Sequence, residues 1–183
     1  MRWDRLFEDL ENEADALRRD VLEGDLVEGT RHEWARLSLL DRLRGSVGAE
    51  VACHVRGGGV RRGSVREVGA DWLLLDCGPR RWDLLPAAAL VGVEGLGARS
   101  GDPAGRPALL LTAVLRGLAR DRAPVVVHLV DGVPVAGTVD RVGADHLDLA
   151  LHPPDVPRLR HEVRGTRTVP IPAVAAVESP PGR

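Results

Sequence analysis

Apolar and polar residues alternate in two stretches of the chain, and this alternation predicts two similar sets of short strands. In the first set we expect strands at 50–55, 60–68, 72–76, 82–85 and 90–93. In the second set we expect strands at 125–130, 135–142, 146–151, 167–171 and 173–177. Short, strongly bent strands of this kind can bury one face in a small barrel without leaving long edges.

The two sets are copies of one unit. When the sequence is aligned with itself, positions 49–76 match 123–150 without a gap, and 12 of the 28 pairs are identical. The alignment then resumes in a new register, where 84–94 meets 168–178. The second copy therefore carries an insertion within 152–167. Such self-similarity indicates duplication of a structural unit.

Each copy contains the tripeptide Gly-Ala-Asp between its second and third strands. These turns contain Gly69 and Asp71 in the first copy and Gly143 and Asp145 in the second. Glycine permits a tight turn, and an Asp carboxylate can accept backbone hydrogen bonds within it. We interpret all four as structural turn residues, because turn chemistry alone accounts for them.

Helical periodicity precedes each set of strands. An acidic amphipathic helix is expected at 3–24, a second helix begins at a capping box and covers 30–44, and a third covers 107–120. The predicted fold class is α+β, mainly β: N-terminal helices followed by two tandem five-stranded barrels, each preceded by a helix. The expected parts are a helical segment at 1–29, a first unit at 30–96, a linker at 97–106 and a second unit at 107–179.

The stretch VVVHLVDGVPVAGTVDRVGADHLDL at 125–149, and more weakly 51–75, resembles the Sm/Lsm family, of which Hfq is the bacterial form. The whole layout is similar to uncharacterised actinobacterial proteins. The resemblance implies Sm-like small barrels and RNA as a ligand. The chain departs from the family where an aromatic residue and an Asn contact a base, since only Trp72 and His146 could stack there and no Asn follows.

Composition narrows the class of protein. The chain has 183 residues and a net charge of −2, and no apolar run approaches the length of a membrane-spanning helix, so we expect a cytoplasmic protein. Residues 1–50 carry a net charge of −5 and residues 51–183 a net charge of +3. This contrast is too weak to demand nucleic acid as a partner.

Arginines in the loops are the candidate nucleic-acid ligands, because Arg beside an aromatic ring can hold phosphates and stack on bases. The insertion is the strongest candidate, since barrel closure does not require it. The predicted residues are Arg158, Arg160, Arg164, Arg167 and His161 in the insertion, Arg61 and Arg62 in the first hairpin, and Arg80, Arg81 and Trp82 in a later loop. The alternative is that these side chains are simply solvated.

No pattern of catalytic residues emerges. His54 and His128 hold matching positions, but no second ligand lies at metal-binding spacing, so we expect outward-facing polar residues. We predict no enzymatic activity, no metal and no cofactor. The expected function is a binding module, with RNA or another nucleic acid held by the Arg-rich loops. The alternative is a protein–protein scaffold or homo-oligomer without nucleic acid, which uses the acidic N-terminal helix or exposed strands.

Overall fold

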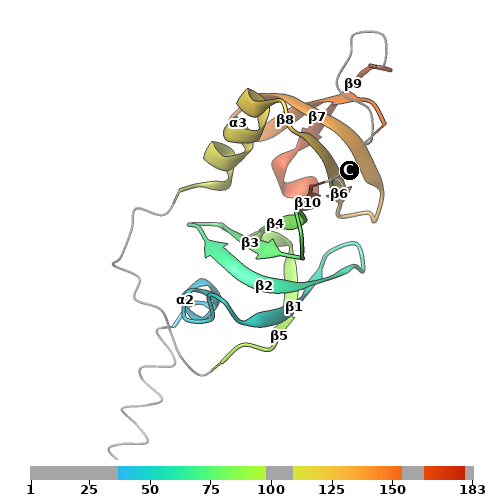
Figure 1. Cartoon of the computed structure of the whole chain (residues 1–183). Coiled ribbons are helices and arrows are strands. Elements are labelled where there is room, and N and C mark those ends of the chain that lie inside the picture. The colour runs from blue at the N-terminus through green and yellow to red at the C-terminus, as the bar shows by residue number, and fades with distance from the viewer. Residues whose placement is uncertain (1–36, 98–108, 154–162, 180–183) are drawn as a thin grey trace, which may run out of the picture. The chain divides into compact units, whose positions relative to one another are not determined.

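The computed structural model describes residues 37–97, 109–153 and 163–179. Within them lie ten strands, two α-helices and two 3-10 turns (Figure 1). The first set of strands is β1 (Glu50–Val55), β2 (Val60–Val68), β3 (Trp72–Asp76), β4 (Trp82–Pro86) and β5 (Leu90–Glu94). The second set is β6 (Pro124–Leu129), β7 (Pro134–Val142), β8 (His146–Leu151), β9 (Thr166–Pro170) and β10 (Val174–Glu178). The 3-10 turns, Ala87–Ala89 and Ile171–Ala173, precede β5 and β10.

The strands form one open sheet, which corrects the prediction of two closed barrels. All pairings are antiparallel, and the order is β5-β1-β2-β3-β4-β10-β6-β7-β8-β9. A closed barrel would require β5 to pair with β4 of its own set. Instead β4 pairs with β10, where Val177 lies opposite Leu84 and Glu178 opposite Asp83. The two sets therefore join through this junction, and Figure 1 shows β4 and β10 between them.

The strand register repeats between the two sets, in agreement with the duplicated sequence. Val51 lies opposite Gly63 in the first set, and Val125 lies opposite Gly137 in the second. A Cβ atom added at Gly63 would overlap the Asp76 carbonyl oxygen, and one at Gly137 would overlap that of Ala150. Glycine is thus needed at both positions because a neighbouring strand crosses too closely for a side chain.

Each hydrophobic core includes at least one buried residue from the other set of strands. Leu84 of β4 is buried in the core formed mainly by the second set. Ala176 of β10 is buried in the core formed mainly by the first. The junction is consequently part of both cores, and each set of strands buries apolar side chains against the other.

Residues 37–38 and 109–110, just before the two described helices, were expected to be helical and are not. Helix α2 spans Leu39–Arg44 and α3 spans Leu111–Asp121. Leu109 and Leu110 precede α3 and are not helical, because the chain is extended at Leu110. The expected helix at 3–24, the start of the helix at 30–44 and residues 98–108 of the linker and third helix lie outside the described residues. Among the described helices, none has the length and apolarity to cross a membrane.

Candidate interaction surface: the strand junction and the outer strands

A cluster of charged side chains crosses the junction between β4 and β10. Arg61 of β2 donates to Glu178 of β10 at 3.0 Å and lies 3.5 Å from Asp83 of β4. His128 of β6 donates to the same Glu178 carboxylate at 2.8 Å, and Arg81 lies 3.5 Å from it. Asp83 is only 4% exposed. These groups satisfy one another, which is what buried charges require.

The cluster shifts the pKa values of its two carboxyl groups in opposite directions. Burial raises the pKa of Asp83, Glu178 acts in the same sense and Arg61 acts against both. Burial also raises the pKa of Glu178, but hydrogen bonds from His128 and Arg61 outweigh it and lower that pKa below its ordinary value. Glu178 is therefore the stable anion at the centre of the cluster.

The outer strands β5 and β9 are the counterparts of the junction strands, and they are more exposed. The alignment of 84–94 with 168–178 places β5 on β10 and β4 on β9. In β10 the first four residues are buried, whereas in β5 Val91 is 70% exposed. In β9 four of the five residues are exposed, whereas in β4 four of the five are buried. Within the described residues, β5 pairs only with β1 and β9 only with β8.

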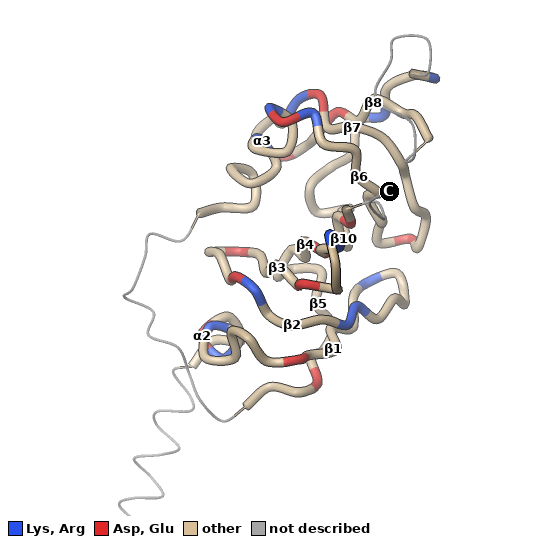
Figure 2. Tube along the Cα trace, viewed as in Figure 1, with Lys and Arg blue, Asp and Glu red and all other residues tan. Residues whose placement is uncertain are grey.

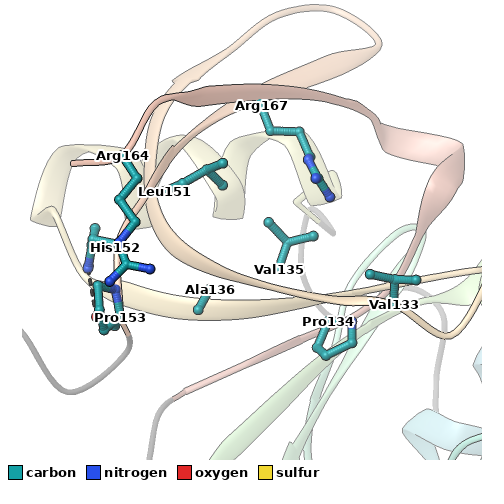
Figure 3. Close-up of a pocket in the computed structure, with 9 residues that line it drawn as sticks. All are labelled: Val133, Pro134, Val135, Ala136, Leu151, His152, Pro153, Arg164 and Arg167. Carbon is teal, nitrogen blue, oxygen red and sulfur yellow. Dashed lines mark hydrogen bonds between the residues drawn. The ribbon is translucent and has the colours of Figure 1, made fainter. Parts of the chain in front are cut away.

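An open cavity of about 480 Å³ lies beside β9 (Figure 3). Its apolar wall includes Val135 and Leu151, and two guanidinium groups, from Arg164 and Arg167, border it. Figure 3 shows the Arg167 side chain reaching from β9 toward Val135. Behind them His152 is buried, with hydrogen bonds of 2.8 Å to Thr138 and to the Pro153 carbonyl oxygen. Chemically, this cavity can accept an anionic group flanked by apolar surface.

The residues predicted to bind nucleic acid have different surroundings in the structure. Arg61 and Arg81 contact Glu178, and the Trp82 backbone donates to Ser179 Oγ at 2.9 Å, so these residues hold the junction. Arg62 is exposed, and Arg80 is exposed with a φ of 60°. Arg164 and Arg167 share the cavity. Arg158, Arg160 and His161 lie outside the described residues.

Acidic and basic positions are interspersed along the described strands rather than gathered on one basic face (Figure 2). Phosphate-binding surfaces are recognised by a basic patch or stripe. The charge distribution of the described residues therefore favours local ion pairing over an extended nucleic-acid track.

The two Gly-Ala-Asp turns are held by helices. Arg44 of α2 donates to the Gly69 carbonyl at 2.8 Å, and Arg116 of α3 donates to that of Gly143 at 3.3 Å. Asp71 Oδ1 accepts a hydrogen bond from the Leu111 backbone at 2.7 Å, so it caps α3. The Asp145 carboxylate instead bonds the exposed His146 side chain.

The two candidate stacking residues lie in different surroundings. Trp72 is buried, and its indole N–H donates to the Leu109 carbonyl at 2.8 Å. It is therefore unavailable to a base. The His146 side chain is 46% exposed.

Sequence reasoning missed the acidic residues of the junction. Asp83 and Glu178 were given no role, and neither was Glu94, which occupies the place of Glu178 in β5 and bonds His54 at 2.8 Å. His54 and His128 were expected as outward-facing polar residues, yet each binds the glutamate of its own set. A signal was present: comparing WDLLP with TRTVP shows that Trp82 and Leu84 of β4 are replaced by threonines in β9.

Within the part of the chain that the structure describes, no group of three or more His, Cys, Asp or Glu side chains is placed to hold a metal ion. Cys53 is buried and Cys77 is half-buried, and burial raises the pKa of both thiols to about 11. No protein-family model and no curated protein matches the sequence.

Proposed function

We propose that this protein is a non-enzymatic interaction module that binds an extended strand of a protein partner along the outer strands of its sheet. The observation that carries the proposal is the contrast between the two copies. The strands that meet at the junction are buried, whereas their counterparts β5 and β9 are the end strands of the sheet and are more exposed. The unpaired backbone groups of an edge strand are a template for addition of another strand.

Chemistry at the junction supports this proposal over catalysis. Arg61 of β2 bonds both Asp83 of β4 and Glu178 of β10, so the cluster spans three strands. This arrangement joins strands and neutralises the charges within the cluster. A strand added at β5 or β9 would use the means that join β4 to β10, backbone pairing and charged side chains.

A capture experiment tests the proposal. We expect the immobilised full chain to retain proteins from an extract of its own cells, and Val91→Lys to lose them, because a charge on β5 opposes strand addition. Val47→Lys is the matched control, since Val47 is 57% exposed in the loop before β1. Equal retention by both variants would contradict the proposal.

A second candidate function is nucleic-acid binding, favoured by the two guanidinium groups of Arg164 and Arg167 at one cavity. In this case nuclease treatment of the extract would abolish retention. Binding of single-stranded RNA by the purified chain would weaken with salt, and Arg164→Ser with Arg167→Ser would reduce the slope by about one unit for each lost phosphate contact. RNA binding that the double variant leaves unchanged would remove this candidate.

A further inference from the structure

We propose that the cavity beside β9 binds a small organic anion: a carboxylate group carried on an apolar body such as a short hydrocarbon chain. The inference goes beyond the proposed function, because it assigns a small molecule to the inside of the cavity rather than a protein strand to the edge of the sheet. Its basis is the polarity of the cavity, the placement of two guanidinium groups and a contrast with the first set of strands.

The wall of the cavity is largely apolar, and the cavity is large enough for a small ligand. Its volume of about 480 Å³ lies within the range of ordinary small-molecule sites. Among the described residues that line it, none is aromatic, so a nucleic-acid base finds nothing there to stack on. A hydrocarbon body therefore fits this wall better than a nucleotide. The apolar lining residues are Val133, Pro134, Val135, Ala136, Leu151 and Pro153.

The fold holds two arginines at the border of this cavity. The Arg164 backbone donates to the Leu151 carbonyl at 2.8 Å and the Leu151 backbone donates to that of Gly165 at 2.8 Å, so the chain that enters β9 is tied to the end of β8. Arg167 lies in β9 itself, opposite Leu149. In Figure 3 the Leu151 side chain lies between the two arginines.

Both guanidinium groups can bind an external anion. Neither Arg164 nor Arg167 forms an ion pair with a carboxylate of the residues that the structure describes. A guanidinium group binds a carboxylate through two parallel hydrogen bonds, and such charge-assisted bonds are among the strongest that side chains form. The two arginines therefore supply a place for the head of an anionic ligand.

A buried histidine holds the wall of the cavity without competing for the ligand. The Pro153 carbonyl oxygen can only accept, so Nδ1 of His152 carries the proton in their 2.8 Å hydrogen bond. In the neutral ring, Nε2 then accepts from the Thr138 hydroxyl, also at 2.8 Å. Both ring nitrogens are thus engaged, and the binding of the anion is left to the arginines.

The first set of strands shows the reverse polarity at the matching place. There Arg61 holds the position of Val135, and Asp83 holds the position of Arg167. The Arg61 side chain is largely buried and donates to the Glu178 carboxylate at 3.0 Å. Beside β9 the inner position is apolar and the cations lie at the border. A ligand matches this inverted polarity when its carboxylate meets the arginines and its apolar body lies against Val135.

Titration of the isotope-labelled full chain with octanoate, followed by NMR, tests the inference. We expect saturable shifts of the amides of Val135, Ala136 and Leu151, because these residues line the cavity. Hexanoate should bind about tenfold more weakly than octanoate, since burial of each methylene strengthens binding by about threefold to fourfold. Octanol lacks the charge and acetate lacks the body, so each should bind at least about tenfold more weakly than octanoate.

Glutamine substitutions test the role of the two guanidinium groups. Arg164→Gln and Arg167→Gln should each weaken octanoate binding by about tenfold, because each removes charge-assisted hydrogen bonds to the carboxylate. Both should leave the weak binding of octanol unchanged. Arg141→Gln is the matched control, since Arg141 is exposed near the end of β7 that lies away from Pro134. All three arginines are exposed, so the variants should melt like the unchanged chain.

Several results would overturn the inference. Octanoate then shifts no amide of the cavity, or it binds no more tightly than octanol or acetate, or both glutamine variants bind it as the unchanged chain does. Tighter binding of uridine monophosphate than of octanoate at the same amides would assign the guanidinium groups to phosphate instead. Capture of proteins is measured separately through Val91→Lys, so either proposal can fail while the other stands.

Discussion

Strands β10 and β5 occupy the same place in two copies of one unit, yet they differ in environment. The sequence VAAVE of β10 is almost entirely buried against β4, whereas LVGVE of β5 faces solvent at Val91. The difference lies in their neighbours, because β10 lies between β6 and the largely apolar β4, whereas β5 pairs with β1 alone among the described strands. A duplicated strand thus serves as core in one copy and as an outer surface in the other.

The largest difference in stability is expected for an acidic substitution at the matching valines Val177 and Val93. Val177 is fully buried and Val93 is half-buried. Val177→Asp should reduce the free energy of unfolding by about 4 kcal/mol, because it buries an unpaired carboxylate. Val93→Asp should cost about 1 kcal/mol. Urea unfolding measures both, and equal losses would contradict the different roles of β10 and β5.

The charged cluster should exist only at the junction, and Arg61 tests this. Arg61→Met leaves Asp83 and Glu178 facing each other without a bridging cation and should cost about 3 kcal/mol at neutral pH. The loss should shrink in acid, since removal of Arg61 raises the folded-state pKa of both carboxyls and protonation then relieves them. Arg62→Met is the control, because this neighbour is exposed and should change stability by less than about 0.5 kcal/mol. A pH-independent loss would argue against the cluster.

The crossing glycines should behave alike in the two copies. Gly63→Val and Gly137→Val should each cost about 1–3 kcal/mol, because the new side chain would collide with the backbone of the adjacent strand. Gly92 of β5 is the comparison, since an added Cβ there meets nothing within 4 Å. Thermal melts compare the three variants. An unchanged melting temperature for Gly137→Val would show that the strand does not bend as described.

Glu178 should make the stability of the folded protein depend on pH. Its pKa is lowered in the folded state, from an ordinary value of 4.5, so its ionised form contributes stability above about that pH. This contribution is lost as the pH falls through the lowered folded-state pKa. Asp83, whose pKa is raised, acts in the opposite sense: its contribution is present in acid and is lost as the pH rises through its folded-state value.

Glu178→Gln removes the first effect and lessens the second, because the Glu178 charge contributes to the raised pKa of Asp83. The variant should be about 1.5 kcal/mol less stable near neutral pH and should approach the unchanged chain below 4.5. Unfolding in urea at several pH values measures the difference. A constant difference across the range would show that ionisation of Glu178 does not stabilise the junction.

The two Gly-Ala-Asp turns should differ slightly in their contribution to stability. Asp71 caps α3 through the Leu111 backbone, so Asp71→Ala should cost about 1 kcal/mol. Asp145 holds the matching position, but its side chain is 87% exposed and bonds only the adjacent His146 among the described side-chain contacts. Asp145→Ala should therefore be nearly neutral. Equal losses in thermal melts would contradict the capping role of Asp71.

The local pattern of apolar and polar residues predicted the strands correctly. The prediction that each set of strands closes into a barrel was wrong. The expected bounds of β1, β2 and β3 agree with the structure, because alternation and turn residues act over a few positions. The partner of β4 depends on a contact between residues far apart in the chain, Leu84 and Val177. Each unit was expected to close on itself because an isolated unit would need to bury its edges. In this chain the second unit covers that edge, so closure is unnecessary.

The candidate site shows the same limit. The arginine of the first hairpin, Arg61, was assigned to phosphate because a sequence does not show which carboxylates lie beside it. Its partners Asp83 and Glu178 come from β4 and β10, and only the strand order brings them together. Arg164 and Arg167 were predicted only as members of the Arg-rich insertion, and the structure places both at one cavity. The cavity beside β9 could not be predicted from the sequence, because distant parts of the chain form it.

Amide hydrogen exchange of the full chain, alone and with the proteins that it captures, tests the central claim most directly: the outer strands bind an added strand as β4 and β10 bind each other. Exchange of β4 and β10 should be slow in both samples, because their pairing lies within the chain. The outward-facing amides of β5 and β9 should exchange quickly in the chain alone and become protected when a captured protein is bound. If β5 and β9 exchange equally fast in both samples, the outer strands do not accept an added strand.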